Sequence, residues 1–186
     1  MVLKLKHKIL KLIIENKNKQ FSIRAISKLL KVDYKNVYGA VQSVKESIRV
    51  QKQGQSCLIS YSSTLTPDLF FVEEERKKEI QSKIKLILKD IESQQNPFFI
   101  AILFGSYAKN TQTKNSDIDI CIIYDNEDTD LINTLSIHPK IQIHGFFYKD
   151  FIKMLQLKTF NVGHEIVKEG IPIHNVEGYY KVLKHE

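Results

Sequence analysis

Asp117 and Asp119, near the middle of the chain, have the type and spacing of a pair that binds a charged ligand. They alternate with Ile118 and Ile120, so on an extended chain both carboxylates point to one face. That face cannot be apolar core, because two unpaired charges would be very costly there. We therefore expect a cationic or phosphorylated partner beside the two aspartates.

The elements that must position this pair are two apolar strands. The run FFIAILF at 98–104 has strand length and predicts a strand covered on both faces. At the strand-to-helix turn that follows, exposed N–H groups and the Ser106 hydroxyl can hold a phosphate. The return strand, DIDICIIY at 117–124, would bring the aspartates close to Gly105 and Ser106. Two carboxylates facing a phosphate cradle predict Mg²⁺, which commonly assists the transfer of phosphorus-centred groups.

This combination of strand, Gly-Ser turn, ten residues and Asp-x-Asp resembles the signature of the DNA-polymerase-β-like nucleotidyltransferase superfamily. The segment GSYAKNTQTKNSDIDI is especially similar to the minimal nucleotidyltransferase branch. The stretch VGHEIVKEGIPIH at 162–174 resembles the helix and final strand that close such domains. The resemblance covers about residues 75–175 and implies a mixed sheet flanked by helices.

The resemblance also implies roles for individual residues. Gly105, Ser106 and Lys109 would bind the triphosphate, and Asp117 and Asp119 would bind Mg²⁺ and support catalysis. A nucleoside monophosphate would pass from a nucleoside triphosphate, expected to be ATP, to an acceptor. Acceptors in the resembling families include protein hydroxyls, nucleic-acid ends and small molecules. Minimal members are often antitoxins that nucleotidylate a partner toxin.

The sequence departs from the family pattern at two places. Many minimal members have Arg-Gly where this chain has Lys109-Asn110, and lysine lacks the bidentate fork of arginine. The family's third carboxylate is expected on the strand KIQIHGFFY at 140–148, whose outward positions are Gln142 and His144. His144 is a candidate catalytic base or metal ligand, or a structural residue. Two hypotheses stay open: an active transferase, and a regulator that only senses a nucleotide.

The N-terminal part of the chain predicts three helices and a hairpin. Leu5, Ile9, Leu12 and Ile13 recur at helical spacing within residues 2–16. Ser22 is expected to cap a second helix, whose inner side carries Ile26, Leu29 and Leu30. Asp33 can cap a third helix with a stripe of valine and isoleucine, at Val37, Val41, Val44 and Ile48. Two strands are then predicted around Gln53-Gly54.

This order resembles a winged helix-turn-helix, over the segment FSIRAISKLLKVDYKNVYGAVQSVKE. In that family the third helix enters the major groove of DNA and the hairpin is the wing. The candidate contacts with double-stranded DNA are Lys35, Tyr38, Gln42, Lys45 and, in the wing, Lys52. Winged helices also serve as protein-docking or dimerisation modules, so a homodimer is the alternative reading.

The distribution of charged residues also separates an N-terminal part of the chain from a C-terminal part. Residues 1–65 hold 13 Lys and Arg against 3 Asp and Glu, whereas residues 66–186 hold 15 against 18. We therefore predict an α+β protein, with a winged helix-turn-helix domain at 1–65 and a nucleotidyltransferase-fold domain at 66–186. A single predicted helix from Glu73 to about Ser93 follows the YSSTLTPDLF linker, and its buried stripe is expected to be Ile80, Ile84, Ile87 and Ile91.

The chain also lacks the marks of export. Cys57 and Cys121 are too few for a disulfide framework. Lysines at positions 4, 6, 8 and 11 interrupt the N-terminal apolar run, so it does not predict a signal peptide. No stretch approaches the ~20 apolar residues of a membrane span. A cytoplasmic protein without a membrane partner is expected.

Overall fold

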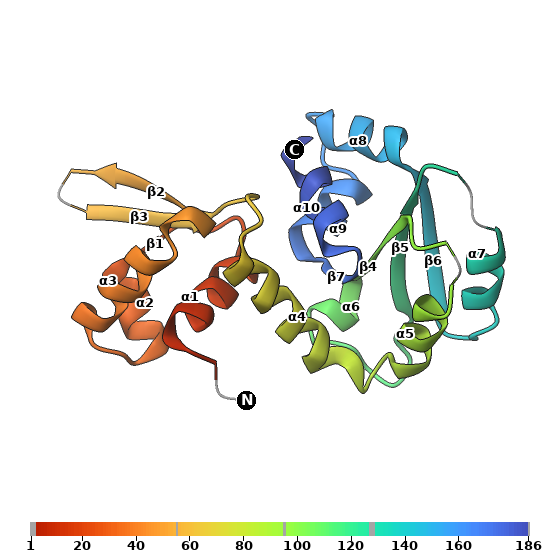
Figure 1. The fold of residues 1–186 in the computed structure, drawn as a ribbon, viewed down its shortest axis with the longest axis horizontal. Helices are drawn as coiled ribbons and strands as arrows, with labels where there is room; N and C mark the ends of the chain where they lie inside the picture. Colours follow the sequence, from red (N-terminus) through yellow and green to blue (C-terminus); the bar gives the residue numbers. More distant parts are fainter. Residues whose placement is uncertain (1–2, 55, 95, 127–128, 186) are drawn as a thin grey trace. The chain divides into compact units, whose positions relative to one another are not determined.

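The computed structural model describes residues 3–54, 56–94, 96–126 and 129–185, which belong to two compact units (Figure 1). The units are Met1–Val72 and Glu73–Glu186, and each is described by itself below. Among the helices of these described ranges, none has the length and apolar character needed to cross a membrane.

The first unit combines helices with a small antiparallel sheet. Its elements are α1 (Leu5–Ile14), β1 (Phe21–Ser22), α2 (Ile23–Leu30), α3 (Tyr34–Ser43), the 3-10 helix η1 (Lys45–Ser47), β2 (Ile48–Gln53) and β3 (Ser56–Tyr61). The strand order is β1-β3-β2, so β2 is an edge strand. The hairpin predicted around Gln53-Gly54 is therefore present, and β1 is a strand that the sequence did not predict.

Side-chain caps fix where α2 and α3 begin, as the sequence predicted. The Ser22 hydroxyl accepts a hydrogen bond of 3.2 Å from the Ala25 amide. The Asp33 carboxylate accepts one of 2.8 Å from the Lys35 amide. Each cap satisfies an amide that has no partner inside its helix. The Ser22 cap therefore fixes the start of α2, and the Asp33 cap fixes the end of the turn between α2 and α3.

Burial in this unit follows most of the predicted apolar stripes. All four residues of the third stripe are buried, from Val37 to Ile48, although α3 ends at Ser43 and Ile48 already belongs to β2. The prediction for Leu29 was wrong, because its exposed fraction is 58%. The inner face of α2 is made by Ile23 and Ile26, with Leu30 half-buried, and Leu29 lies beyond the edge of that face.

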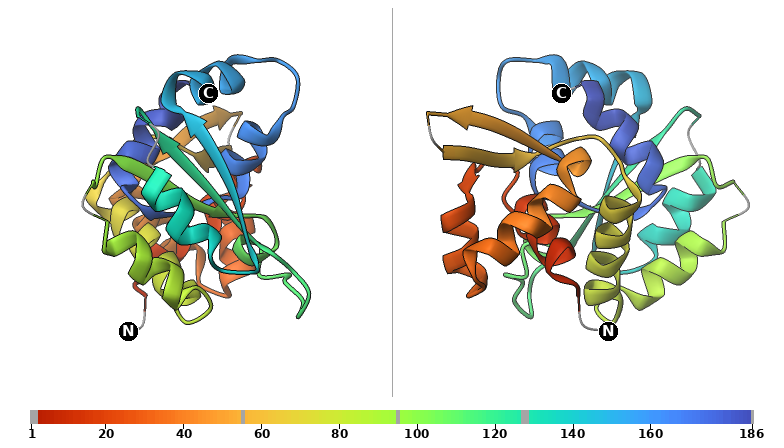
Figure 2. Two further views of the ribbon diagram at one scale, coloured as in Figure 1. Left: turned by 90° about the vertical axis from the view of Figure 1, so that its right-hand side faces the viewer. Right: turned by 60° about the vertical axis from the view of Figure 1, so that its left-hand side comes forward.

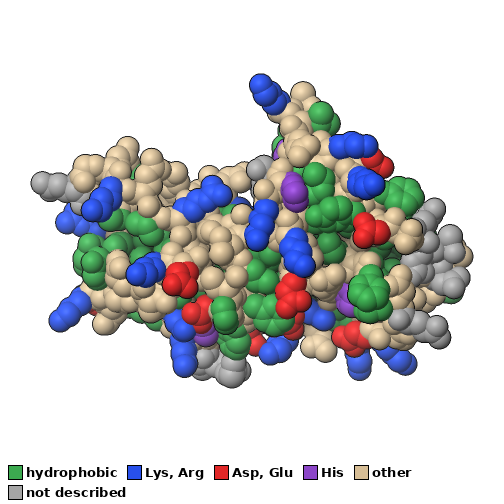
Figure 3. Space-filling model, turned by 45° about the horizontal axis from the view of Figure 1, so that its top comes forward, with side chains coloured by type: hydrophobic (Ala, Val, Ile, Leu, Met, Phe, Trp, Pro, Cys, Tyr) green, Lys and Arg blue, Asp and Glu red, His purple; other side chains and the backbone are tan. Residues whose placement is uncertain are grey.

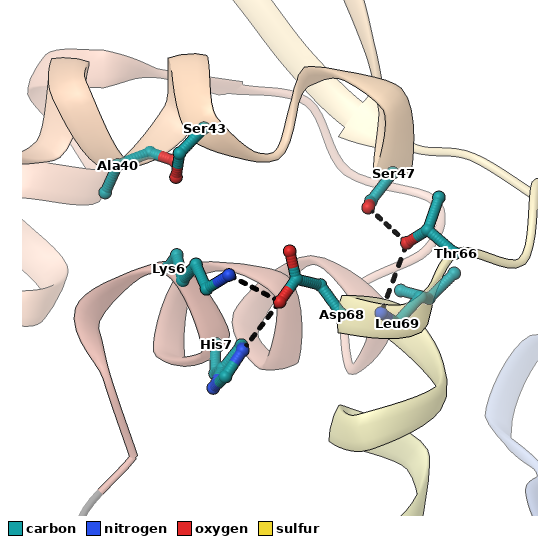
Figure 4. Close-up of polar contacts among 8 residues, drawn as sticks. All are labelled: Lys6, His7, Ala40, Ser43, Ser47, Thr66, Asp68 and Leu69. Carbon is teal, nitrogen blue, oxygen red and sulfur yellow. Dashed lines mark hydrogen bonds and ion pairs between the residues drawn. The ribbon is translucent and has the colours of Figure 1, made fainter.

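Polar contacts hold the end of the first unit to its helices (Figure 4). The Asp68 carboxylate lies 2.6 Å from the Lys6 ammonium and 2.9 Å from His7 Nε2. The Ser47 and Thr66 hydroxyls share a hydrogen bond of 2.5 Å. Pro67 begins helix α4 (Pro67–Gln81), as suits a residue whose missing N–H costs nothing in a first helical turn. Part of the segment predicted as a linker is therefore helical.

The second unit is a four-stranded sheet covered by helices (Figures 1 and 2). Its elements after α4 are α5 (Lys85–Glu92), β4 (Phe99–Phe104), α6 (Gly105–Ala108), β5 (Ile118–Tyr124), α7 (Thr129–Ser136), β6 (Ile141–Phe147), α8 (Tyr148–Gln156), α9 (Val162–Glu169), β7 (Ile171–His174), α10 (Val176–Val182) and the 3-10 helix η2 (Leu183–His185). The single helix predicted from Glu73 to Ser93 is wrong, because α4 ends at Gln81 and α5 starts at Lys85.

The sheet is mixed, as predicted. Its strand order is β6-β5-β4-β7, in which β5 and β6 are parallel and the other pairs are antiparallel. Figure 2 shows β5 and β6 running side by side. An apolar cluster joins one face of the sheet to α5 and α7, with Ile120 and Ile122 fully buried in it. Helices α8, α9 and α10 pack against strands of the sheet as well.

Candidate active site

Gly105 joins β4 to α6 with a backbone conformation that other residues rarely adopt. Its φ is +67°, in the left-handed region that glycine enters without steric cost. A β-carbon at this position would collide with the Oδ2 atom of Asp119. The structure therefore places the backbone at Gly105 directly against the Asp119 carboxylate.

The two aspartates lie at the start of β5 and differ in exposure. Asp119 lies within the strand and its side chain is 23% exposed, whereas Asp117 precedes the strand and is exposed. Ile118 and Ile120 pack on the side of the sheet that α5 and α7 cover. Because side chains alternate along a strand, Asp119 points to the opposite face. That is the face on which the Gly105 turn meets it.

Strand β6 supplies two neighbours, neither of them an acid, where the family pattern leads one to expect a carboxylate. Gln142 is paired with Asp119 in the parallel register and is exposed. His144, two residues further, brings its Nε2 atom to 4.0 Å from Asp119 Oδ1, which is too long for a hydrogen bond. Its ring lies edge-on to Phe104, with 5.1 Å between centroids. The residue opposite Asp119 is thus an uncharged glutamine.

Lys109, expected to bind phosphate, is held by two glutamates of α9. Its ammonium lies 2.6 Å from Glu169 Oε2 and 3.7 Å from Glu165 Oε1. Close contact with Glu169 raises the pKa of Lys109. Neither glutamate was predicted from the sequence. Their i, i+4 spacing, which puts them on one side of the predicted closing helix, was the signal that could have found them.

The charges around Asp119 are mostly negative. Burial raises the pKa of the Asp119 carboxyl, and the charges of Asp117 and Glu165 raise it further. The charges of His144 and Lys109 act in the opposite direction. Two further carboxylates, of Asp117 and Glu165, therefore act on Asp119, and a divalent cation would relieve their repulsion.

Polar atoms without partners mark the same region. The Ser106 hydroxyl and His144 Nε2 are buried, and neither has a hydrogen-bond partner among the described residues. Within the described ranges, no three His, Cys, Asp or Glu side chains converge on one point. Mg²⁺ commonly uses one or two carboxylates together with substrate phosphates, so this donor set fits it. Asp117 and Asp119 are the side chains that would hold the ion.

The residues predicted to contact DNA all lie exposed on the first unit, although not on one helix. Lys35, Tyr38 and Gln42 belong to α3, Lys45 to η1 and Lys52 to the edge strand β2. Side chains of Lys and Arg are scattered over the face drawn in Figure 3, with Asp and Glu side chains among them.

Comparison with known proteins identifies the second unit. The family model described as "Polymerase beta, Nucleotidyltransferase" matches residues 83–177, just over half of the chain. No curated protein and no solved structure matches the chain significantly. The matched range contains the Gly105 turn, both aspartates, β6 and α9. The chain therefore belongs to the polymerase β nucleotidyltransferase family.

Proposed function

We propose that the second unit binds a nucleoside triphosphate with Mg²⁺, expected to be ATP, and transfers its nucleotidyl group to an acceptor hydroxyl. The observation that supports this proposal is the contact between the Gly105 turn and the Asp119 carboxylate, because such a turn is suited to phosphate and such a carboxylate to a metal ion. In the reaction, the acceptor oxygen forms a bond with the α-phosphorus, and the bond from that phosphorus to the departing pyrophosphate breaks.

In this reaction, individual residues of the chain would have the following roles. The unpartnered Ser106 hydroxyl can donate to a phosphate oxygen, and Gly105 lets the phosphate approach the backbone. Asp117 and Asp119 would hold the metal, which supplies charge neutralisation for the phosphates when it is bound. His144 Nε2, 4.0 Å from Asp119 Oδ1, is the candidate to accept the proton of the acceptor hydroxyl. A protein hydroxyl, including one on a partner toxin, is the first acceptor to test.

A second candidate is a regulator that binds the nucleotide without transferring it. The specific observation in its favour is the pairing of Asp119 with Gln142, a position where an acid would be expected in an active family member. In this alternative, Mg²⁺ and nucleotide bind at the same residues, and their binding changes the protein's interaction with another molecule.

The first unit is proposed to be a winged helix-turn-helix that binds double-stranded DNA. Support comes from the capped turn between α2 and α3, from exposed Lys35 and Gln42 on α3, and from a hairpin whose strand β2 is exposed from Arg49 to Gln53. Lysine and glutamine side chains suit phosphate and base-edge contacts. The alternative function of this unit is dimerisation.

The test of the main proposal is a labelling experiment with the full chain. The protein is incubated with α-³²P-labelled ATP, Mg²⁺ and lysate of its host, and covalently labelled acceptors are separated by size. We expect a labelled acceptor that disappears with Asp117→Asn/Asp119→Asn and with EDTA. Tight binding of Mg·ATP without any labelled acceptor would support the regulator instead, and absence of Mg·ATP binding would refute both.

A further inference from the structure

Helix α9 approaches the proposed active site from the side of β4. It packs against β4 and against α6, the short helix that starts at Gly105. Lys109, the residue directly after α6, is paired with two α9 glutamates. The Asp119 carboxylate in turn lies against Gly105, the first residue of α6. Glu165, an acid that does not lie on β6, is therefore held beside the short helix whose first residue adjoins Asp119.

The two glutamates differ in how firmly Lys109 holds them. Glu169 Oε2 is in close contact with the ammonium at 2.6 Å, whereas Glu165 Oε1 is 3.7 Å away, beyond hydrogen-bond distance. Glu165 also has the more exposed side chain, with 40% exposed against 25% for Glu169. Of the two, Glu165 is thus the one that can turn away without breaking a close contact.

We propose that Glu165 supplies the third carboxylate of the active site, in place of the acid that β6 lacks. The inference rests on the proposed function, since it concerns the binding of Mg²⁺ with a nucleoside triphosphate. Triphosphate oxygens would draw Lys109 away from Glu165, and the freed carboxylate would turn toward Asp119 and the metal. Lys109 is then the counter-ion that keeps Glu165 beside the site until the nucleotide arrives.

This exchange of partners accounts for two features together. Among the described side chains no three potential ligands meet at one point, as expected if the third one is still turned to Lys109. Gln142, opposite Asp119, carries no charge, so a carboxylate from another element would supply the negative charge that β6 does not. A glutamate has three rotatable bonds between Cα and its carboxylate, so it can change partners without movement of the helix.

The experiment measures how much Mg²⁺ is needed for ATP binding, by calorimetry on the full chain. Glu165→Gln should raise the Mg²⁺ concentration for half-maximal ATP binding by about 10- to 100-fold, the range for loss of a group that supports a metal. Glu169→Gln is the matched control, since it removes the closer partner of Lys109 on the same helix. It should change that concentration less than about threefold, with thermal unfolding confirming that both variants fold.

A rescue variant makes the test specific for the missing acid. Adding Gln142→Glu to Glu165→Gln places a carboxylate opposite Asp119 and should bring the Mg²⁺ concentration for half-maximal ATP binding most of the way back to that of the unaltered protein. Equal effects of Glu165→Gln and Glu169→Gln would overturn the inference, because Glu165 would then act only by anchoring Lys109. The inference would also be overturned if Glu165→Gln left the Mg²⁺ concentration for half-maximal ATP binding unchanged. Failure of the unaltered protein to bind Mg·ATP would refute the proposed function itself, and the inference with it.

Discussion

At the scale of single residues, Gly105 is the position where substitution by a larger residue should be most costly. Gly105→Ala would place a β-carbon against the Asp119 carboxylate and force alanine into a positive φ. We expect at least a tenfold loss of Mg·ATP affinity, together with about 1 kcal/mol of lost stability from the φ alone. Calorimetry and urea unfolding measure the two effects.

The matched control for this change lies in the β2–β3 hairpin. Gly54 has a φ of +59°, and a β-carbon there would meet nothing within 4 Å. Gly54→Ala should therefore share the backbone cost and leave Mg·ATP binding untouched. If both variants lost nucleotide binding alike, the contact with Asp119 would not be the reason for glycine at 105.

Ionisation of Asp119 should destabilise the folded protein, so its effect on the free energy of unfolding should depend on pH. Its pKa is raised by burial first and by neighbouring acids, so the fold disfavours its ionised form. That cost is present above the raised pKa and absent below the ordinary aspartate pKa. Asp119→Asn should therefore stabilise the protein at pH 7, by less than about 1 kcal/mol because solvent screens the group, and change little at pH 3. Urea midpoints of both proteins at the two pH values measure this, and equal shifts would contradict it.

The site residues that lie close together along the chain could be predicted from the sequence. Gly105, Ser106 and the two aspartates fall within 15 residues of each other, and their spacing carries the family resemblance. Glu165 lies on an element that folds back from far along the chain, so only the packing of α9 reveals it. The register of β6 was also undetermined by sequence, because Gln142 and His144 share one face of that strand.

At the scale of elements, apolar spacing predicted burial better than it predicted boundaries. Ile80, Ile84, Ile87 and Ile91 are all buried, as the stripe predicted. Their spacing of four, three and four residues is satisfied equally by one helix or by two with a break at 82–84. The break depends on how the second half of the stripe packs on the sheet, which local sequence does not encode. Strand β1 was missed for a related reason, since only its pairing with β3 makes it a strand.

A buried ion pair in α4 should make the second unit sensitive to the loss of one of its two partners. Glu73 is fully buried and Arg76 is 5% exposed, and their side chains lie 2.6 Å apart. The Tyr180 hydroxyl of α10 donates a hydrogen bond of 2.8 Å to Glu73. Arg76→Met leaves the Glu73 charge buried without its partner and should cost about 3–5 kcal/mol in urea unfolding.

Two further variants test the origin of that loss. Glu73→Gln/Arg76→Met removes both charges and should be less destabilised than Arg76→Met alone. Lys78→Met breaks the exposed pair with Glu75 on the same helix and should leave the urea midpoint unchanged. A double variant as unstable as the single one would assign the loss to packing of the arginine stem instead of to the unpaired charge.

At the scale of the whole molecule, the uneven charge leads to the prediction about DNA. Residues 1–65 carry 13 Lys and Arg against 3 Asp and Glu. Binding of such a surface to duplex DNA releases counterions, so affinity should fall steeply as salt rises. Lys35→Ala/Lys52→Ala removes one exposed cation from α3 and one from β2. In the full chain, these changes should weaken binding and lower the slope of log affinity against log salt by about 1–2.

The control for that measurement removes the same charge from the other unit. Lys149 and Lys158 are exposed in residues 73–186, so Lys149→Ala/Lys158→Ala lowers the net charge of the chain equally. Fluorescence anisotropy with a labelled duplex at several salt concentrations should give this variant an unchanged slope, because its lysines lie outside the proposed DNA-binding surface. If both double variants lowered the slope alike, binding would follow net charge alone. The assignment of α3 and the β2–β3 hairpin as the DNA contact would then be wrong, and the dimerisation role of the first unit would become the better explanation.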